Sequence, residues 1–159
     1  MLHKALRQLP YLVHTNRELG LMLKGVKPLT YFMEGVGDEP EVCIRYWRMF
    51  DTHVARGHLT KRESFGAWPD QPQFKYRRLF YTLPGQEWRV DAMLALLNEP
   101  GPWSDSHERR FGELLGYQDW QMDYWLAHRP SLRSNVSVHQ DSDGRINHRF
   151  DHVDIDRIQ

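Results

Sequence analysis

The segment of residues 45–58, RYWRMFDTHVARGH, holds the side chains best suited to acid–base chemistry. Asp51 and His53 are two positions apart, so on a β-strand they would share a face, and the carboxylate could orient the imidazole as a general base. Arg45 is an even number of positions from both residues, so on a strand it would lie on the same face and could hold an anionic group. Asp51, His53 and Arg45 are therefore the catalytic candidates. The alternative is a strand end and turn with solvated side chains, because no nucleophile or second acid is tied to the pair by spacing.

A second candidate is the histidine-rich stretch HQDSDGRINHRFDHVDID, residues 139–156. If Asp143-Gly144 forms a two-residue hairpin turn, His139 faces His148, and His152 lies on the same side. Histidines and carboxylates in that arrangement can bind a divalent metal. A four-residue loop would shift the register and separate the histidines, which leaves a polar hairpin or tail. We expect no cofactor, and a divalent metal at these histidines is the alternative.

Aromatic residues crowd the region after residue 100. Trp120 and Tyr124 are spaced as neighbours on a helix, and Trp103 and Tyr117 are close in sequence. Such side chains can close a core, line a ligand pocket or form a surface for a partner. We take these four residues, with Arg48, as the binding candidates; carboxylates beside Trp120 disfavour a stacking platform for single-stranded nucleic acid.

The composition narrows the class of protein. The chain has 159 residues, the size of one ordinary domain, with 13% aromatic residues and 21 basic against 21 acidic side chains. A zero net charge disfavours nucleic-acid binding, which exploits a basic surface. A lone cysteine, Cys43, excludes an internal disulfide and a cysteine-based zinc site, and its place in an apolar run indicates an inert thiol. Without a signal-peptide core or a run of about 18 apolar residues, the chain is predicted to be cytoplasmic and not membrane-bound.

The elements that must position these residues follow from periodicity and from turn signals. Apolar spacing of three and four residues predicts helices, and alternation or β-branched and aromatic content predicts strands. Helices are expected at residues 15–25, 86–99, 105–116 and 119–129, the last ending before Pro130; a short helix is expected before Pro10. Strands are expected at residues 29–34, 41–50 and 74–83, and residues 55–65 are expected to form a turn that enters another strand.

Strands grouped in the middle of the chain and helices grouped after them predict an α+β fold. We expect a single domain over residues 1–130, with a mostly antiparallel sheet packed against several helices. Residues 131–159 are expected to form a polar C-terminal hairpin or tail.

The function predicted from these features is the binding of a macromolecular partner. Two stretches, RELGLMLKGVKPLTYF and FGELLGYQDWQMDYWL, resemble those of small bacterial proteins. A charge-balanced, aromatic-rich chain without an assembled catalytic motif indicates an accessory, immunity or inhibitor protein that binds another protein, and a homo-oligomer is left open. The alternative is a small enzyme or ligand-binding protein that handles a polar or anionic metabolite through Asp51, His53 and Arg45.

Overall fold

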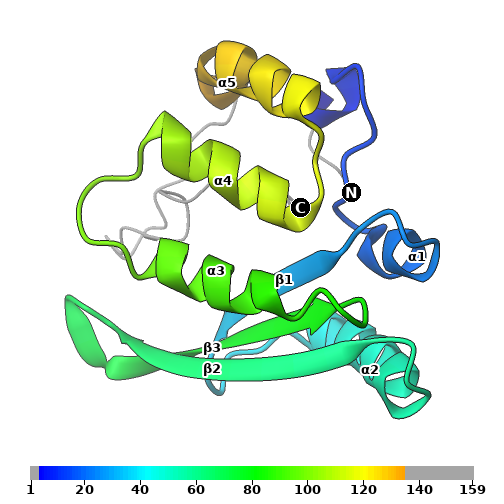
Figure 1. The fold of residues 1–159 in the computed structure, drawn as a ribbon. Helices are drawn as coiled ribbons and strands as arrows, with labels where there is room; N and C mark the ends of the chain where they lie inside the picture. The colour runs from blue at the N-terminus through cyan, green and yellow to red at the C-terminus, as the bar shows by residue number, and fades with distance from the viewer. Residues whose placement is uncertain (1–3, 135–159) are drawn as a thin grey trace. The chain divides into compact units, whose positions relative to one another are not determined.

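A computed structural model describes residues 4–134 and shows an α+β fold, as predicted (Figure 1). The described contacts form two compact units. One, the sheet unit, comprises residues 18–99 with 114–116, and the other, the helical unit, includes residues 4–17, 100–113 and 117–134. The domain boundaries expected from the sequence stay a prediction, and His139, His148 and His152 lie outside the described residues.

The sheet unit is built on a three-stranded antiparallel sheet with the order β1-β3-β2. The strands are β1 (Leu29–Gly35), β2 (Thr60–Trp68) and β3 (Gln71–Thr82). β2 and β3 form a long hairpin, and β1 pairs with the other side of β3, with Leu29 opposite Thr82. The predicted strands at residues 29–34 and 74–83 are thereby confirmed, as is the turn entering a strand within residues 55–65, where β2 begins at Thr60.

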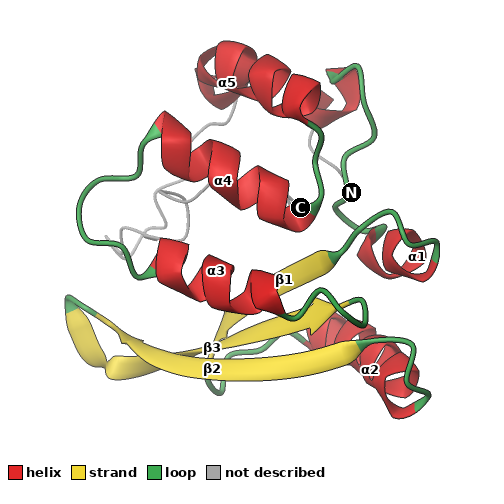
Figure 2. Ribbon diagram, in the orientation of Figure 1, coloured by secondary structure: helices red, strands yellow, loops and turns green. Residues whose placement is uncertain are grey.

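The two faces of the sheet carry different helices (Figure 2). On β3, Leu79 and Tyr81 point to the face that packs against α1 (Glu18–Leu23) and α2 (Glu41–Ala55). They join a buried cluster completed by Leu19, Met22, Trp47, Phe50 and Leu59. Phe80 points to the opposite face because strand side chains alternate. Arg62, which pairs with Phe80, donates from there to Asp91 of α3 (Trp88–Leu97).

The strand expected at residues 41–50 is wrong, because this segment belongs to helix α2. Its apolar residues recur at helical spacing, and that stripe lies against the sheet: Trp47 and Phe50 are buried, and Cys43 and Val54 pack beside them. The same residues also alternate as they would in a strand. As a 15-residue helix, however, the segment packs a continuous apolar stripe on the sheet and covers more of it. The strand parity that grouped Arg45, Asp51 and His53 therefore does not apply.

The helical unit contains a short 3-10 helix, η1 (Lys4–Gln8), and α5 (Asp119–Ser134), together with most of α4 (Asp105–Leu115). Ser104 caps α4, since its Oγ accepts a hydrogen bond from the His107 backbone N–H at 3.4 Å. α5 runs past Pro130, which corrects the expected end at residue 129. A proline removes one helix hydrogen bond but does not by itself end a helix.

A buried carboxylate holds this unit together. Glu108 of α4, 1% exposed, accepts hydrogen bonds from two indole nitrogens: Trp103 Nε1 at 2.7 Å and Trp125 Nε1 at 2.8 Å. Arg129 Nη1 lies 3.8 Å from the same carboxylate. One acidic side chain thus joins the loop before α4 to α5. Trp103, expected as a binding residue, serves here as a structural donor.

Candidate functional site

Three aromatic side chains of the helical unit surround Tyr11. The Tyr11 ring stands edge-on to Trp120 at a centroid distance of 5.5 Å and to Tyr117 and Tyr124 at 6.2 Å each. Edge-to-face packing is the favoured geometry for aromatic pairs at these distances. We call Tyr11, Tyr117, Trp120 and Tyr124 the Tyr11 cluster. It contains three of the binding residues expected from the sequence.

Local sequence explains how the cluster forms. Trp120 and Tyr124 are one turn apart on α5, and Tyr117 lies just before that helix. The segment that carries Tyr11 is held to them by His14, whose ring stacks on Tyr117 at 3.9 Å. The backbone N–H of His14 also donates to the Tyr117 hydroxyl at 3.0 Å. The extended segment after η1 is therefore fixed against the start of α5.

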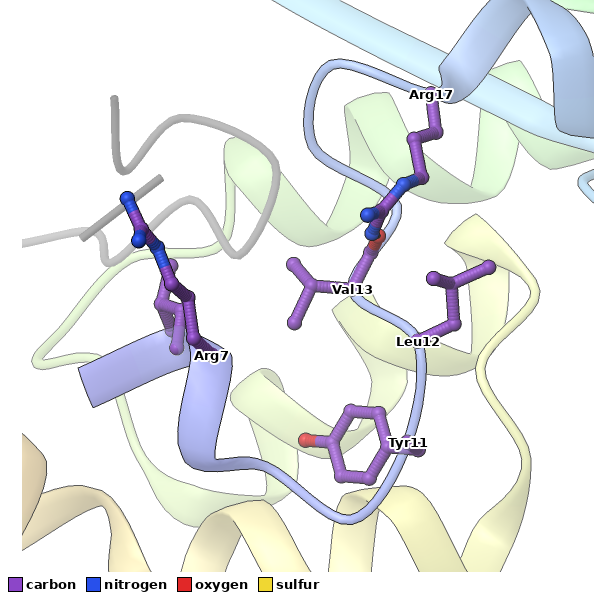
Figure 3. Close-up of a pocket in the computed structure, with 6 residues that line it drawn as sticks. Arg7, Tyr11, Leu12, Val13 and Arg17 are labelled. Carbon is purple, nitrogen blue, oxygen red and sulfur yellow. The ribbon is translucent and has the colours of Figure 1, made fainter. Parts of the chain in front are cut away.

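A pocket of about 240 Å³ opens beside the cluster (Figure 3). It is lined by Leu6, Arg7, Tyr11, Leu12, Val13 and Arg17. Arg7 stands across the space from Tyr11 and Val13 in Figure 3, and Arg17 reaches towards the Val13 carbonyl, to which it donates at 3.3 Å. The walls are largely apolar and the two charged side chains are both cationic, so the pocket suits an apolar group with a neighbouring negative charge.

The Tyr11 hydroxyl is neutral at physiological pH. Burial, and to a lesser degree the nearby Tyr124, raise the pKa of Tyr11 to about 12. An ionised phenolate would lose solvation there, so the protonated form is favoured. Tyr11 can consequently act as a hydrogen-bond donor at the pocket wall.

The predicted catalytic residues are not brought together. Arg45 is exposed on α2 and lies 3.8 Å from the carboxylate of Glu41. Asp51 and His53 are two positions apart on a helix, about 200° around its axis, so they do not share a face. His53 instead meets His58, with their Nδ1 atoms 3.1 Å apart. Acid–base catalysis by these residues stays a prediction.

Asp51 is engaged in a network with the sheet. Its Oδ1 accepts a hydrogen bond from the buried Tyr81 hydroxyl at 2.9 Å and lies 2.9 Å from Lys61 Nζ. Lys61 also pairs with Glu63 at 3.2 Å. Burial and the bond to Asp51 raise the pKa of Tyr81 above its ordinary value. The network connects α2 to β2 and β3, and its role is structural. Arg48, a binding candidate from the sequence, is exposed on the same helix.

Sequence reasoning missed the residues that complete the site: Arg7, Tyr11, Leu12 and Arg17. Tyr11 and Trp120 are far apart in sequence, and no periodicity links an extended segment near residue 11 to a helix near residue 120. Local signals do predict that Trp120 and Tyr124 share a helical face. What they pack against depends on tertiary structure.

Within residues 4–134 no group of three or more His, Cys, Asp or Glu side chains is arranged to hold a metal ion. Cys43, the single cysteine of the chain, is half-buried and packs on the core of the sheet unit. No helix in this range has the length and apolarity needed to cross a bilayer. Comparison of the chain with protein-family models, curated proteins and solved structures finds no match.

Proposed function

We propose that this chain is a small bacterial, cytoplasmic accessory, immunity or inhibitor protein that binds another protein through the Tyr11 cluster and its pocket. The observation that carries the proposal is the convergence of four aromatic rings beside an apolar pocket in one compact unit. Tyrosine and tryptophan are enriched among the residues that dominate protein–protein binding energy.

Two side chains at this site combine large apolar area with exposure. Trp120 is 48% exposed and Leu12 is 49% exposed, although both adjoin well-packed residues. The Trp120 indole N–H donates to Gln118 Oε1 at 2.6 Å, which holds the ring in one orientation. A fixed, half-exposed aromatic ring loses little side-chain entropy on binding, so it is a favourable anchor.

The pocket defines the chemistry of the partner. Its volume of about 240 Å³ lies below the range of roughly 300–1,000 Å³ typical of small-molecule sites. It therefore suits one side chain of a protein better than a whole metabolite. Arg7 and Arg17 favour a partner segment in which an apolar side chain adjoins an aspartate or glutamate.

A matched pair of tryptophans allows a sharp test. A photo-crosslinking amino acid is placed at position 120, and in a control chain at position 88, where Trp88 of α3 is 50% exposed in the sheet unit. Crosslinked proteins from the native host are identified, and the purified partner is titrated by calorimetry. We expect crosslinking from position 120, and at least tenfold weaker binding in W120A and R17A but not in W88A. If W88A weakens binding and W120A does not, the proposal is wrong.

Two further measurements test other occupants of the site. Light scattering of the isolated protein tests whether a second copy of the chain binds there: a dimer that W120A dissociates would show that the occupant is this chain and not a different protein. Calorimetric titration of the partner into a chain that ends at residue 134 tests whether the C-terminal segment occupies the site. Partner affinity that rises at least tenfold on truncation would show that this segment competes for the pocket.

A further inference from the structure

The end of α2 brings two histidines together through its backbone. The helix ends at Ala55, Arg56 is the C-cap, and Gly57 follows with a φ of +74°, which glycine adopts readily. The N–H of Gly57 donates to the Val54 carbonyl at 2.9 Å, and the N–H of His58 donates to the His53 carbonyl at 2.9 Å.

This pair of hydrogen bonds is a Schellman motif, which commonly places the residue after the glycine in contact with the residue five positions earlier. That contact is frequently apolar. In this chain both residues are histidines, and the motif brings their rings to a centroid distance of 5.4 Å with an interplanar angle of 34°. The backbone hydrogen bonds at the end of the helix therefore fix the positions of the two residues whose rings meet.

The two nitrogens that meet are both Nδ1 atoms, 3.1 Å apart. A divalent transition metal binds imidazole nitrogen at about 2.0–2.1 Å. Two nitrogens at that distance from one ion and 3.1 Å from each other subtend an angle of about 100° at the metal, between the values for square and tetrahedral coordination. The separation of the two atoms therefore matches that of two adjacent ligands of one ion.

We propose that His53 and His58 form a two-histidine site for a borderline transition-metal ion such as Zn²⁺, Ni²⁺ or Cu²⁺. His58 is exposed and His53 is partly exposed, so the remaining coordination positions are open to water or to a ligand from another molecule. The C-terminal end of α2 adds a favourable negative potential for a cation. Asp51 does not complete the site, because it is held by Tyr81 and Lys61.

The test is a titration of the full chain with Zn²⁺ alone. Binding is measured by calorimetry and by NMR of the histidine side-chain nitrogens. To remove the histidines of the C-terminal segment as ligands, the titration is performed in an H139N/H148N/H152N background. We expect one ion to bind per chain, with the His53 and His58 Nδ1 resonances shifting together. H53N and H58N should each weaken binding at least tenfold, and circular dichroism checks that both variants fold.

H107N is the matched control, because His107 also lies at a helix end but its Nδ1 faces Ser104 Oγ at 2.5 Å. It should leave the Zn²⁺ affinity unchanged. Zn²⁺ binding that survives H58N, or that shifts His107 or His128 first, would overturn the proposal. A titration that shows no binding at millimolar Zn²⁺ would also overturn it.

Discussion

At the scale of single residues, Glu108 shows how much depends on one buried charge. Its two oxygens accept from two indoles on different segments, and the carboxylate is almost fully buried. A buried carboxylate whose oxygens both accept hydrogen bonds stabilises a fold, and the same group becomes costly once a partner is missing.

We predict that E108Q lowers the free energy of unfolding by about 1–3 kcal/mol, because the new amide NH₂ faces an indole N–H and leaves a buried donor unsatisfied. E108A should cost about twice as much, since both indoles lose their acceptor. Urea unfolding followed by tryptophan fluorescence measures both variants. D91N is the control: the Arg62–Asp91 pair is exposed, so less than about 1 kcal/mol is expected. Equal losses in E108Q and D91N would contradict this role.

A second residue-scale prediction concerns alkaline pH. The pKa of Tyr11 is raised to about 12, above the value near 10 of an exposed tyrosine, so the folded chain keeps a proton that the unfolded chain releases. The contribution of Tyr11 to the free energy of unfolding is therefore fully present below about pH 10 and is lost as the pH rises towards 12. Y11F should show a shallower decline, measured as the urea midpoint at several alkaline pH values. Identical slopes in the two proteins would exclude the effect.

At the scale of elements, α2 shows which signals are local and which are not. Cys43, Trp47, Phe50 and Val54 recur at helical spacing, but apolar and polar residues of the same segment also alternate as in a strand. Packing on the sheet decides between the two and makes the segment a helix. The strands and the other helices were predictable because turn signals such as Gly25, Gly85 and Gly116, all with positive φ, mark their ends. Asp51 and His53 were grouped by strand parity, and on helix α2 the two residues lie on different faces.

Two glycines within helices provide a prediction at this scale. Helix propensity alone favours alanine over glycine by about 0.8–1.0 kcal/mol. Gly20 of α1 has open space where a Cβ would stand, so G20A should stabilise the protein. At Gly112 of α4, a Cβ would lie 2.1 Å from the sulfur of Met122, which is 1% exposed.

G112A should therefore destabilise the protein by about 1–3 kcal/mol, as overpacking does in a closed core. The opposite signs of the two substitutions, measured by thermal unfolding, test the packing of α4 on α5. In an M122A background, G112A should cost less than in the natural chain, because the added methyl group then fills vacated space. Stabilisation by G112A would show that α4 and α5 are not in close contact.

At the scale of the whole molecule, charge balance dominates. Equal numbers of basic and acidic residues give no net charge at pH 7, and nine histidines lie in the chain. Proteins without net charge repel each other weakly in solution. Histidine is the side chain that ordinarily changes charge between pH 5 and 8, so a composition with nine histidines predicts a cationic chain on mild acidification.

We predict that the second virial coefficient of the purified protein is lowest near pH 7 and rises at about pH 5.5. Light scattering at low ionic strength measures it, and added salt should remove the rise because charges are screened. A minimum far from neutral pH would mean that a large share of the titratable groups has shifted pKa values. Composition alone was enough to make this prediction, whereas the Tyr11 cluster needed the folded structure.

The strand order has a consequence for the behaviour of many copies. β2 is an outer strand of the sheet, and the consecutive residues Lys61, Arg62 and Glu63 place charges on both of its faces: Lys61 and Glu63 on one and Arg62 on the other. A strand from another chain that added alongside would have to strip water from these groups, an arrangement that natural sheets use against edge-to-edge growth. The residues that tie β2 to its neighbouring helices also protect this edge from becoming a template for fibrils.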